Sequence, residues 1–250
     1  ATIATSEITV AADYAVTASG NTSVAQANVI DGDTTGVITA TITEGDAATL
    51  VTLTGTGNAY TITTTDASVT AANLNTLDGK TTVNVVATGS GTITGAAADV
   101  ATAISASTID TAGNVITTLA SGSAAATDLT TINGDTTTAV GAGAVSVITG
   151  TAAEIAAVVA ADAEITVASN YTVTVDAAAA TITDLNAVNV DTTGAMTITT
   201  GATITGNASD FSTFVGLTDG GVAATEFLTT NYNAVVTDAV ANIANLLALD

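Results

Sequence analysis

Apolar and polar residues alternate with a period of two along much of the chain. The runs Tyr60–Thr64, Tyr171–Val175 and Met196–Thr199 place threonine on one side and an aliphatic or aromatic residue on the other. This pattern is typical of a strand with one buried face. The chain is therefore predicted to contain many short strands.

A second pattern, between the strands, puts two aliphatic residues three positions apart, so that one helical turn buries both. The pairs are Leu74 with Leu77, Leu129 with Ile132, and Leu185 with Val188. Helix starts are indicated by Thr151–Glu154, which has the form of a capping box, and by the related Asn207–Asp210. Short helices are therefore expected to alternate with the strands.

One phrase, which we call the anchor phrase, recurs at roughly even intervals. It consists of Asp or Asn, one residue, Asp or Lys, and two threonines, and it begins at Asp31, Asp78, Asn133 and Asn189, with Asp250 in the same phase. A tyrosine precedes the anchor residue by 17 or 18 positions at Tyr14, Tyr60, Tyr171 and Tyr232. Such repetition indicates a supersecondary unit stacked in tandem.

Each repeat contains two similar halves of 27 or 28 residues, as measured from Leu77 to Ile104 and on to Ile132. A coil of this length is the unit of a solenoid. We expect a mainly β fold, a parallel β-solenoid of about nine coils with short helical turns in many coils. A single continuous solenoid would span residues 1–250, with a half unit at roughly 1–30 and two-coil units at 31–77, 78–132, 133–188 and 189–249.

Two other architectures are open at this point. The hydrophobic content of 47% is mostly alanine and aromatic residues make up only 3%, which suggests a low-complexity disordered chain. Against disorder, proline is absent and the mean hydropathy is +0.55. A tandem array of β-sandwiches is disfavoured because units of about 55 residues are small for independent sandwiches.

The charge excludes several classes of partner. Twenty-three acidic residues against one base, Lys80, and no histidine give a net charge of −22. Nucleic acid binding requires Lys and Arg, and an anionic bilayer would repel the chain. No apolar stretch is long enough for a membrane helix, no signal peptide is visible, and the lack of cysteine excludes disulfides.

The anchor phrase, the Ile-Thr-Gly sequence at Ile93, Ile148 and Ile204, and the Thr/Ala/Val/Asp-rich composition resemble the β-solenoid repeats of large secreted bacterial proteins. These are surface-layer proteins, giant adhesins and cell-surface filament proteins. The resemblance implies an extracellular or cell-surface location and a non-enzymatic structural role in a surface layer, filament or long adhesin. The Gly-Gly-x-Gly-x-Asp nonapeptide of calcium-binding repeats-in-toxin proteins is missing.

Catalysis has few groups to draw on. Without histidine, cysteine or arginine, the chain offers only carboxylates, hydroxyls, tyrosines and one amine. A carboxylate pair that hydrolyses a glycoside is the remaining enzymatic alternative. We expect no enzymatic activity.

The anchor phrase has the Asx-x-Asp spacing of oxygen ligands for a hard cation such as Ca²⁺. The candidate ligands are Asp31, Asp33, Asp78, Asn133, Asp135, Asn189 and Asp191. The same residues suit a tight turn, in which Gly takes a positive φ and the Asx side chain caps the backbone. We favour structural turns, with bound calcium as the alternative.

Threonine and tyrosine suggest two further functions. Thr-x-Thr strands such as Thr39–Thr43 would align hydroxyls in outward files, as several ice-binding proteins do, so ice binding is the alternative function. We expect Tyr14, Tyr60, Tyr171 and Tyr232 to form a packing ladder. If the rings are instead exposed, they would bind a cell-surface glycan, and the chain would be a carbohydrate-binding adhesin.

Both ends of the chain fall within the repeat pattern, since the sequence of Glu7–Tyr14 is nearly the same as that of Glu164–Tyr171. An uncovered solenoid end exposes strand edges and core. We therefore expect subunits to form a homopolymer end to end, a contact that does not close. The expected contact joins Ile243, Leu246 and Leu249 of one copy to Ile8, Val10 and Tyr14 of the next.

Overall fold

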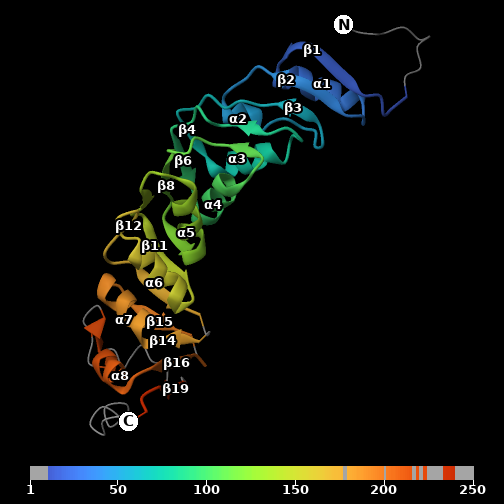
Figure 1. Ribbon diagram of the computed structural model, residues 1–250. Helices are drawn as coiled ribbons and strands as arrows, with labels where there is room; N and C mark the ends of the chain where they lie inside the picture. The colour runs from blue at the N-terminus through green and yellow to red at the C-terminus, as the bar shows by residue number, and fades with distance from the viewer. Residues whose placement is uncertain are drawn as a thin grey trace, which may run out of the picture. The chain divides into compact units, whose positions relative to one another are not determined.

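A computed structural model of the chain shows strands and helices in alternation (Figure 1). The structure describes residues 11–176, 179–199, 201–215, 218–219, 222–223 and 233–239. Contacts divide the chain into two compact units, Ala1–Thr94 with Thr102–Val115, and Gly95–Ala101 with Ile116–Asp250.

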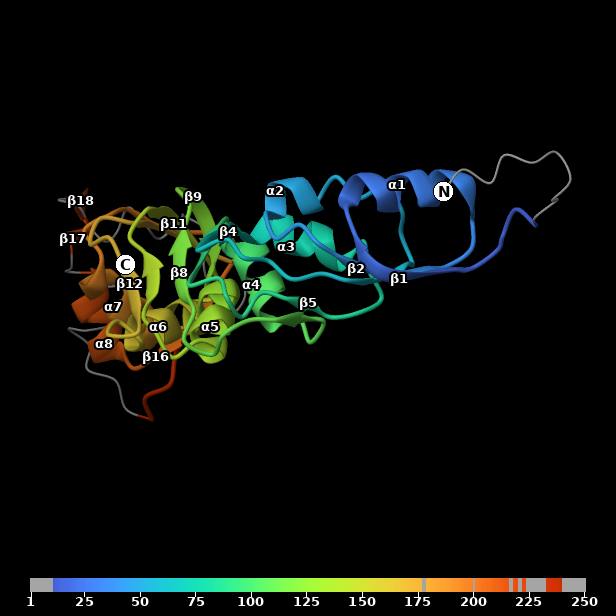
Figure 2. The ribbon, with the colours of Figure 1, turned by 90° about the horizontal axis from the view of Figure 1, so that it is seen from above.

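The first unit has three sets of parallel strands. Its elements are β1 (Val16–Thr22), α1 (Val24–Asp33), β2 (Ile38–Ile42), α2 (Ala47–Leu50), β3 (Ala59–Thr61), β4 (Ser68–Thr70), α3 (Ala71–Asp78), β5 (Val85–Val86), β6 (Thr92–Gly95) and β7 (Ile109–Asp110). α4 (Ala97–Ser105) has residues in both units. β2 pairs with both β1 and β3, β4 pairs with β6, and β5 pairs with β7. Figure 2 shows α1 over one face of β1 and β2.

The second unit repeats this arrangement. Its elements are β8 (Ile116–Leu119), β9 (Gly122–Ala125), α5 (Ala126–Asp135), β10 (Val140–Ala142), β11 (Val145–Gly150), α6 (Ala152–Ala160), β12 (Ile165–Val167), β13 (Thr172–Val175), β14 (Ala180–Thr181), α7 (Ile182–Asp191), β15 (Met196–Ile198), β16 (Thr203–Gly206), α8 (Ala208–Val215), β17 (Thr218–Asp219), β18 (Val222–Ala223) and β19 (Asn233–Val236). Parallel pairing joins β8, β10 and β12, then β9, β11, β13 and β15, and finally β14, β16 and β19. Only the short β17–β18 pair, among the described strands, is antiparallel. α5, α6, α7 and α8 lie side by side in sequence order.

Each parallel pair joins a strand to the corresponding strand after one intervening helix, and we call a helix with the strands that precede it a coil. Paired residues are 24 positions apart at Ser68 and Thr92, 20 at Thr39 and Ala59, and 30 at Thr203 and Asn233. The spacing is thus more variable than the expected 27 or 28 residues. A continuous solenoid of about nine such coils stays a prediction.

The fold is mixed α/β with parallel strands in several sheets. The expected mainly β character is not confirmed, because the segments between strands form regular helices rather than short turns. α1, α5 and α7 each have 10 residues. Side-chain caps at Ser23 and Thr181 favour the helix at α1 and α7.

The core lies between the strands and the helices. In β2 the apolar residues Ile38, Ala40 and Ile42 are buried, while Thr39 and Thr41 are exposed, as the period of two predicts. The predicted helical pairs are confirmed as core residues with no exposed surface, namely Leu74, Leu77, Leu129, Ile132, Leu185 and Val188.

Both predicted helix starts are confirmed. Thr151 and Glu154 form a capping box at the start of α6. Before α8, the N–H of Asp210 donates to Asn207 Oδ1 at 2.8 Å, and Asn207 Nδ2 donates back to Asp210 Oδ2 at 2.7 Å. None of the helices described by the structure has both the length and the apolar character needed to cross a membrane.

Candidate functional site: the anchor phrase

The anchor phrase lies at the C-terminal end of a helix in each described repeat. Asp31–Asp33 closes α1, Asp78 closes α3, Asn133–Asp135 closes α5, and Asn189–Asp191 closes α7. The interpretation of the phrase as a tight turn is therefore wrong at α1, α5 and α7, where the helix continues through the Asx-x-Asp positions and ends before the first threonine. At the second phrase the helix ends at Asp78, and Gly79 and Lys80 form a turn in which Gly79 has a φ of −70° rather than the expected positive value.

The two threonines of the phrase begin a new coil and hold it to the previous coil, and we call them the threonine clamp. Thr34 Oγ1 donates to the carbonyl of Tyr14 at 2.6 Å and accepts from the N–H of Gly36 at 3.0 Å. The N–H of Thr35 donates to the carbonyl of Ala12 at 2.9 Å. The clamp therefore holds a strand that begins about 20 residues earlier.

The same clamp recurs in both units. Thr81 Oγ1 donates to the carbonyl of Tyr60 at 2.6 Å, and Thr192 Oγ1 donates to the carbonyl of Tyr171. The second threonines, Thr82 and Thr193, each donate an N–H at 2.8 Å, to the carbonyls of Asn58 and Ser169. The recurrence explains why the phrase and the tyrosine keep a constant distance in the sequence.

The acid that opens the first anchor phrase reaches forward to the next coil. Asp31 Oδ2 accepts from Thr54 Oγ1 at 2.9 Å, and Asp31 Oδ1 accepts from Asn58 Nδ2 at 3.1 Å. An added Cβ at Gly55 would lie 2.1 Å from Asp31 Oδ1 and 2.3 Å from Asn58 Nδ2, so a larger residue would displace both side chains. Asp31 thus acts as a bridge between coils.

Asn28, one helical turn before Asp31, was missed by the sequence analysis. Its Nδ2 donates to the carbonyl of Thr52 at 2.9 Å, and its Oδ1 accepts from the N–H of Thr54 at 3.0 Å. The available signal was an asparagine at the same place in other repeats, Asn75 and Asn186.

Asn58 joins these contacts to the core. It is 3% exposed, its Oδ1 accepts from the N–H of Ile38 at 2.8 Å, and its Nδ2 donates to Tyr60 Oη at 3.1 Å as well as to Asp31. Buried polar groups need such partners because an unsatisfied one costs the full desolvation penalty.

The tyrosines that the structure describes are core residues to different degrees. Tyr60 and Tyr171 are 0% and 1% exposed, and Tyr14 is half-buried, whereas Tyr232 lies outside the described residues. Tyr60 in β3 pairs with Ala40 in the adjacent strand β2. The tyrosine rings therefore do not stack on one another in successive strands. The burial leaves neither Tyr60 nor Tyr171 available to bind a sugar.

Both buried phenols stay protonated. Burial raises the pKa of Tyr171, and the hydrogen bond and charge of Asp191 raise it further. Tyr171 Oη donates to Asp191 Oδ2 at 2.7 Å. For Tyr60, burial is again the main cause of a raised pKa, followed by the charge of Asp31.

Two of the candidate calcium ligands, Asp31 and Asp191, are used in hydrogen bonds within the protein. Both oxygens of Asp31 already accept hydrogen bonds, and Asp191 accepts one from Tyr171. Within the described part of the chain, no three acidic residues gather where they would hold a metal ion. Calcium binding stays a prediction.

Comparison with protein families, with curated proteins and with solved structures finds no match. What the chain does must therefore be inferred from its own contacts.

A set of acids that the sequence analysis overlooked caps helices across coils. Glu44 accepts from the N–H of Val24 at 3.0 Å, Asp66 from that of Ala47 at 2.8 Å, and Asp238 from that of Ala208 at 2.6 Å. Each donor belongs to the first residue of a helix in the preceding coil, where a negative charge is favourable. Burial acts to raise the pKa of Glu44, but the hydrogen bonds from Val24 and Thr43 leave it lowered overall.

Outward threonines form short rows rather than long files. Thr41 pairs with Thr61, and Thr174 pairs with Thr149 and Thr197. The rows are interrupted where Ala59 faces Thr39 and Ala125 faces Thr149, and the register shifts within β1.

Most residues of the expected end-to-end contact cannot be placed. Ile8, Val10, Ile243, Leu246 and Leu249 lie outside the described residues, and only Tyr14 lies within them.

Proposed function

We propose that this protein is a non-enzymatic structural module of an extracellular assembly, a surface layer, filament or long adhesin, built as a solenoid of α/β coils. The observation that carries the proposal is the use of the anchor phrase. Its threonines bind the previous coil, and Asp31 binds the next one. The most regular polar residues of the chain thus hold coils together.

The chemistry of the remaining groups supports a structural role. The chain has no histidine and no cysteine, and Lys80 is its single base. Carboxylates that would be candidates for catalysis or metal binding instead cap helices or accept from buried tyrosine, as Glu44 and Asp191 do. These acidic residues therefore stabilise helices and buried groups within the fold.

Single-molecule pulling between the chain ends tests the structural role. A stack in which each coil contacts only its neighbours should unravel coil by coil. Release of one coil of about 24 residues should lengthen the chain by about 80 Å, so repeated steps of this size are expected. A featureless extension, or one all-or-none step, would refute the solenoid.

Location is tested separately. Antibodies against the purified protein should label intact cells of the organism that makes it. Labelling only after the cells are opened would exclude the extracellular part of the proposal.

Ice binding is a second candidate, favoured by the paired outward threonines Thr41 with Thr61 and Thr149 with Thr174 and Thr197. A thermal-hysteresis measurement tests it, with Thr174→Leu as the variant. The interrupted rows lead us to expect no hysteresis. A clear effect that Thr174→Leu abolishes would replace the structural proposal.

A further inference from the structure

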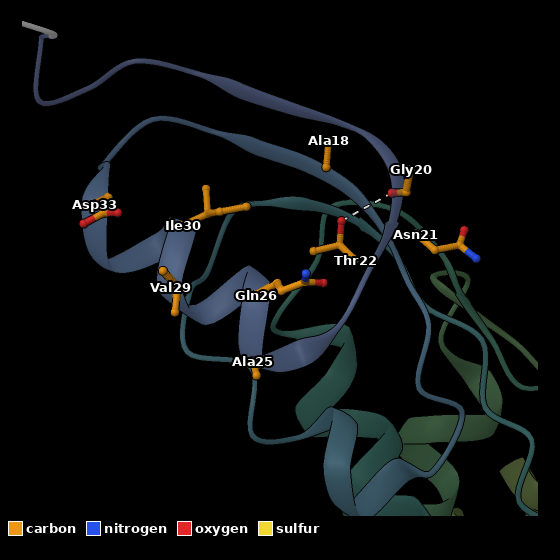
Figure 3. A pocket seen from close by; sticks show the side chains of 9 residues that line it. All are labelled: Ala18, Gly20, Asn21, Thr22, Ala25, Gln26, Val29, Ile30 and Asp33. Carbon is orange, nitrogen blue, oxygen red and sulfur yellow. Dashed lines mark hydrogen bonds between the residues drawn. The ribbon is translucent and has the colours of Figure 1, made fainter. Parts of the chain in front are cut away.

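The first described coil has an open hollow of about 600 Å³ between β1 and α1 (Figure 3). Ala18 and Thr22 line it from β1, and Ala25, Val29 and Ile30 line it from α1. Val29 is 67% exposed. The hollow therefore opens the interior of this coil to solvent.

The repeat shows what the hollow would look like if it were covered. Tyr14, Val16 and Ala18 form a row of alternate residues in and just before β1, and all three are only half-buried. After 157 residues, the corresponding positions are held by residues at most 1% exposed, Tyr171, Val173 and Val175. Ile30, directly before the anchor residue Asp31, is half-buried, whereas Val188, directly before the anchor residue Asn189, has no exposed surface.

The cover on the second of these coils is the coil before it. β11 pairs with β13 in parallel, and α6 packs beside α7. Among the described strands, β1 pairs only with β2, so its other edge has no such neighbour. The β1–α1 face thus has the chemistry of a surface that receives another coil of this repeat.

β19 has an edge whose backbone groups can pair with a further parallel strand such as β1. The N–H groups of Asn233 and Thr237 donate to the carbonyls of Ala202 and Gly206, each at 2.9 Å. Because backbone groups alternate along a strand, the N–H groups of Ala234 and Val236 point away from β16. In the part of the chain that the structure describes, β19 is the last strand of its sheet.

We propose, building on the structural role proposed above, that the β1–α1 face binds the β19 edge of a second copy of this chain. The parallel sheet formed by β16 and β19 in one copy would continue into β1 of the next. Such a contact is head-to-tail, and it gives a closed ring or an open fibre according to the rotation between copies. With a net charge of −22 on each copy, salt should strengthen the association.

Sedimentation of the purified chain between about 0.05 and about 0.5 M NaCl tests the contact. Two variants each damage one surface. Val29→Asp puts a charge at the hollow, and Ala234→Pro removes an N–H from the free edge of β19 while leaving the bonds to β16. The matched control is Val190→Asp, because Val190 is 77% exposed on α7 and does not line the hollow.

The unaltered chain should associate as salt rises. Val29→Asp and Ala234→Pro should each weaken association by at least about tenfold, while Val190→Asp should not. An equal mixture of the two surface variants should form dimers and stop there, because each variant keeps one intact surface. Circular dichroism checks their folding, and Ala25→Glu replaces Val29→Asp if the latter unfolds.

Three results would overturn the inference. The first is an unaltered chain that stays monomeric at every salt concentration. The second is association of both variants as strong as that of the unaltered chain. The third is association that appears only after removal of residues 1–10, which would make that segment the occupant of the hollow. Stepwise unravelling under force does not depend on any of these results, so the structural role is judged separately.

Discussion

Replacing Asn58 with alanine removes the side chain that links Ile38, Tyr60 and Asp31. Two of the groups left behind, the N–H of Ile38 and the hydroxyl of Tyr60, belong to residues with no exposed surface. A buried polar group without a partner costs about 1–3 kcal/mol, so Asn58→Ala should lower the free energy of unfolding by about 2–6 kcal/mol. Asp31 retains Thr54 and adds little to this loss.

Urea unfolding at pH 7, followed by far-UV circular dichroism, measures the loss. The matched control is Asn114→Ala, because Asn114 is exposed in the same unit. A loss for Asn58→Ala no larger than that of the control would refute the assigned role of this network.

Asn58→Asp tests the same network through pH. The introduced carboxyl keeps an acceptor for Ile38 but faces Asp31, so its pKa in the folded state should rise above the unfolded value of about 3.9. A raised folded pKa means that the variant loses stability as pH increases through this range. The deficit relative to the unaltered chain should be smallest below about pH 4 and largest near pH 7. A deficit independent of pH would contradict the assigned contact with Asp31.

Three other predictions concern the clamp, the acidic caps and calcium. Thr192→Val removes the hydroxyl that donates to the carbonyl of Tyr171, and it should lower the free energy of unfolding in urea by about 1–2 kcal/mol. Thr197→Val, at an exposed strand position, should leave this free energy nearly unchanged. Equal effects of the two variants would show that the threonine clamp does not contribute to stability. Because the pKa of Glu44 is lowered in the folded state, its contribution to stability is present above the unfolded pKa and is lost as pH falls through the folded pKa. Glu44→Gln should therefore flatten this part of the curve of unfolding free energy against pH. A curve unchanged by the substitution would contradict the assigned cap. Calcium chloride and sodium chloride at equal ionic strength should raise the melting temperature equally, because Asp31 is already bonded; a larger effect of calcium would establish a cation site.

Features that depend on a few neighbouring residues could be predicted from the sequence. The capping box at Thr151 and the buried pair of Leu74 and Leu77 follow from spacings of three residues. The anchor phrase was misinterpreted although it is equally local. Asp31-Gly-Asp33 has the composition of a turn, but the helix begun at Val24 continues through it.

Contacts between coils were beyond the sequence analysis because both partners are ordinary polar residues about 20 positions apart. Nothing in Glu44 alone indicates that it caps the helix that begins at Val24. A signal did exist in the repetition, since an acid follows threonine directly after a strand at Glu44 and again at Asp238. The helix content was underestimated for a related reason, because the caps that complete α1 and α8 come partly from the next coil.

The direction of these bonds has a consequence for synthesis. Thr34 secures Tyr14, Glu44 completes the helix at Val24, and Thr192 secures Tyr171, so later sequence always locks earlier sequence. As the chain emerges from the ribosome, each coil can be finished only after about 20 further residues have appeared. Folding would then proceed coil by coil from the N-terminus, and each new coil would prevent the coil before it from unfolding.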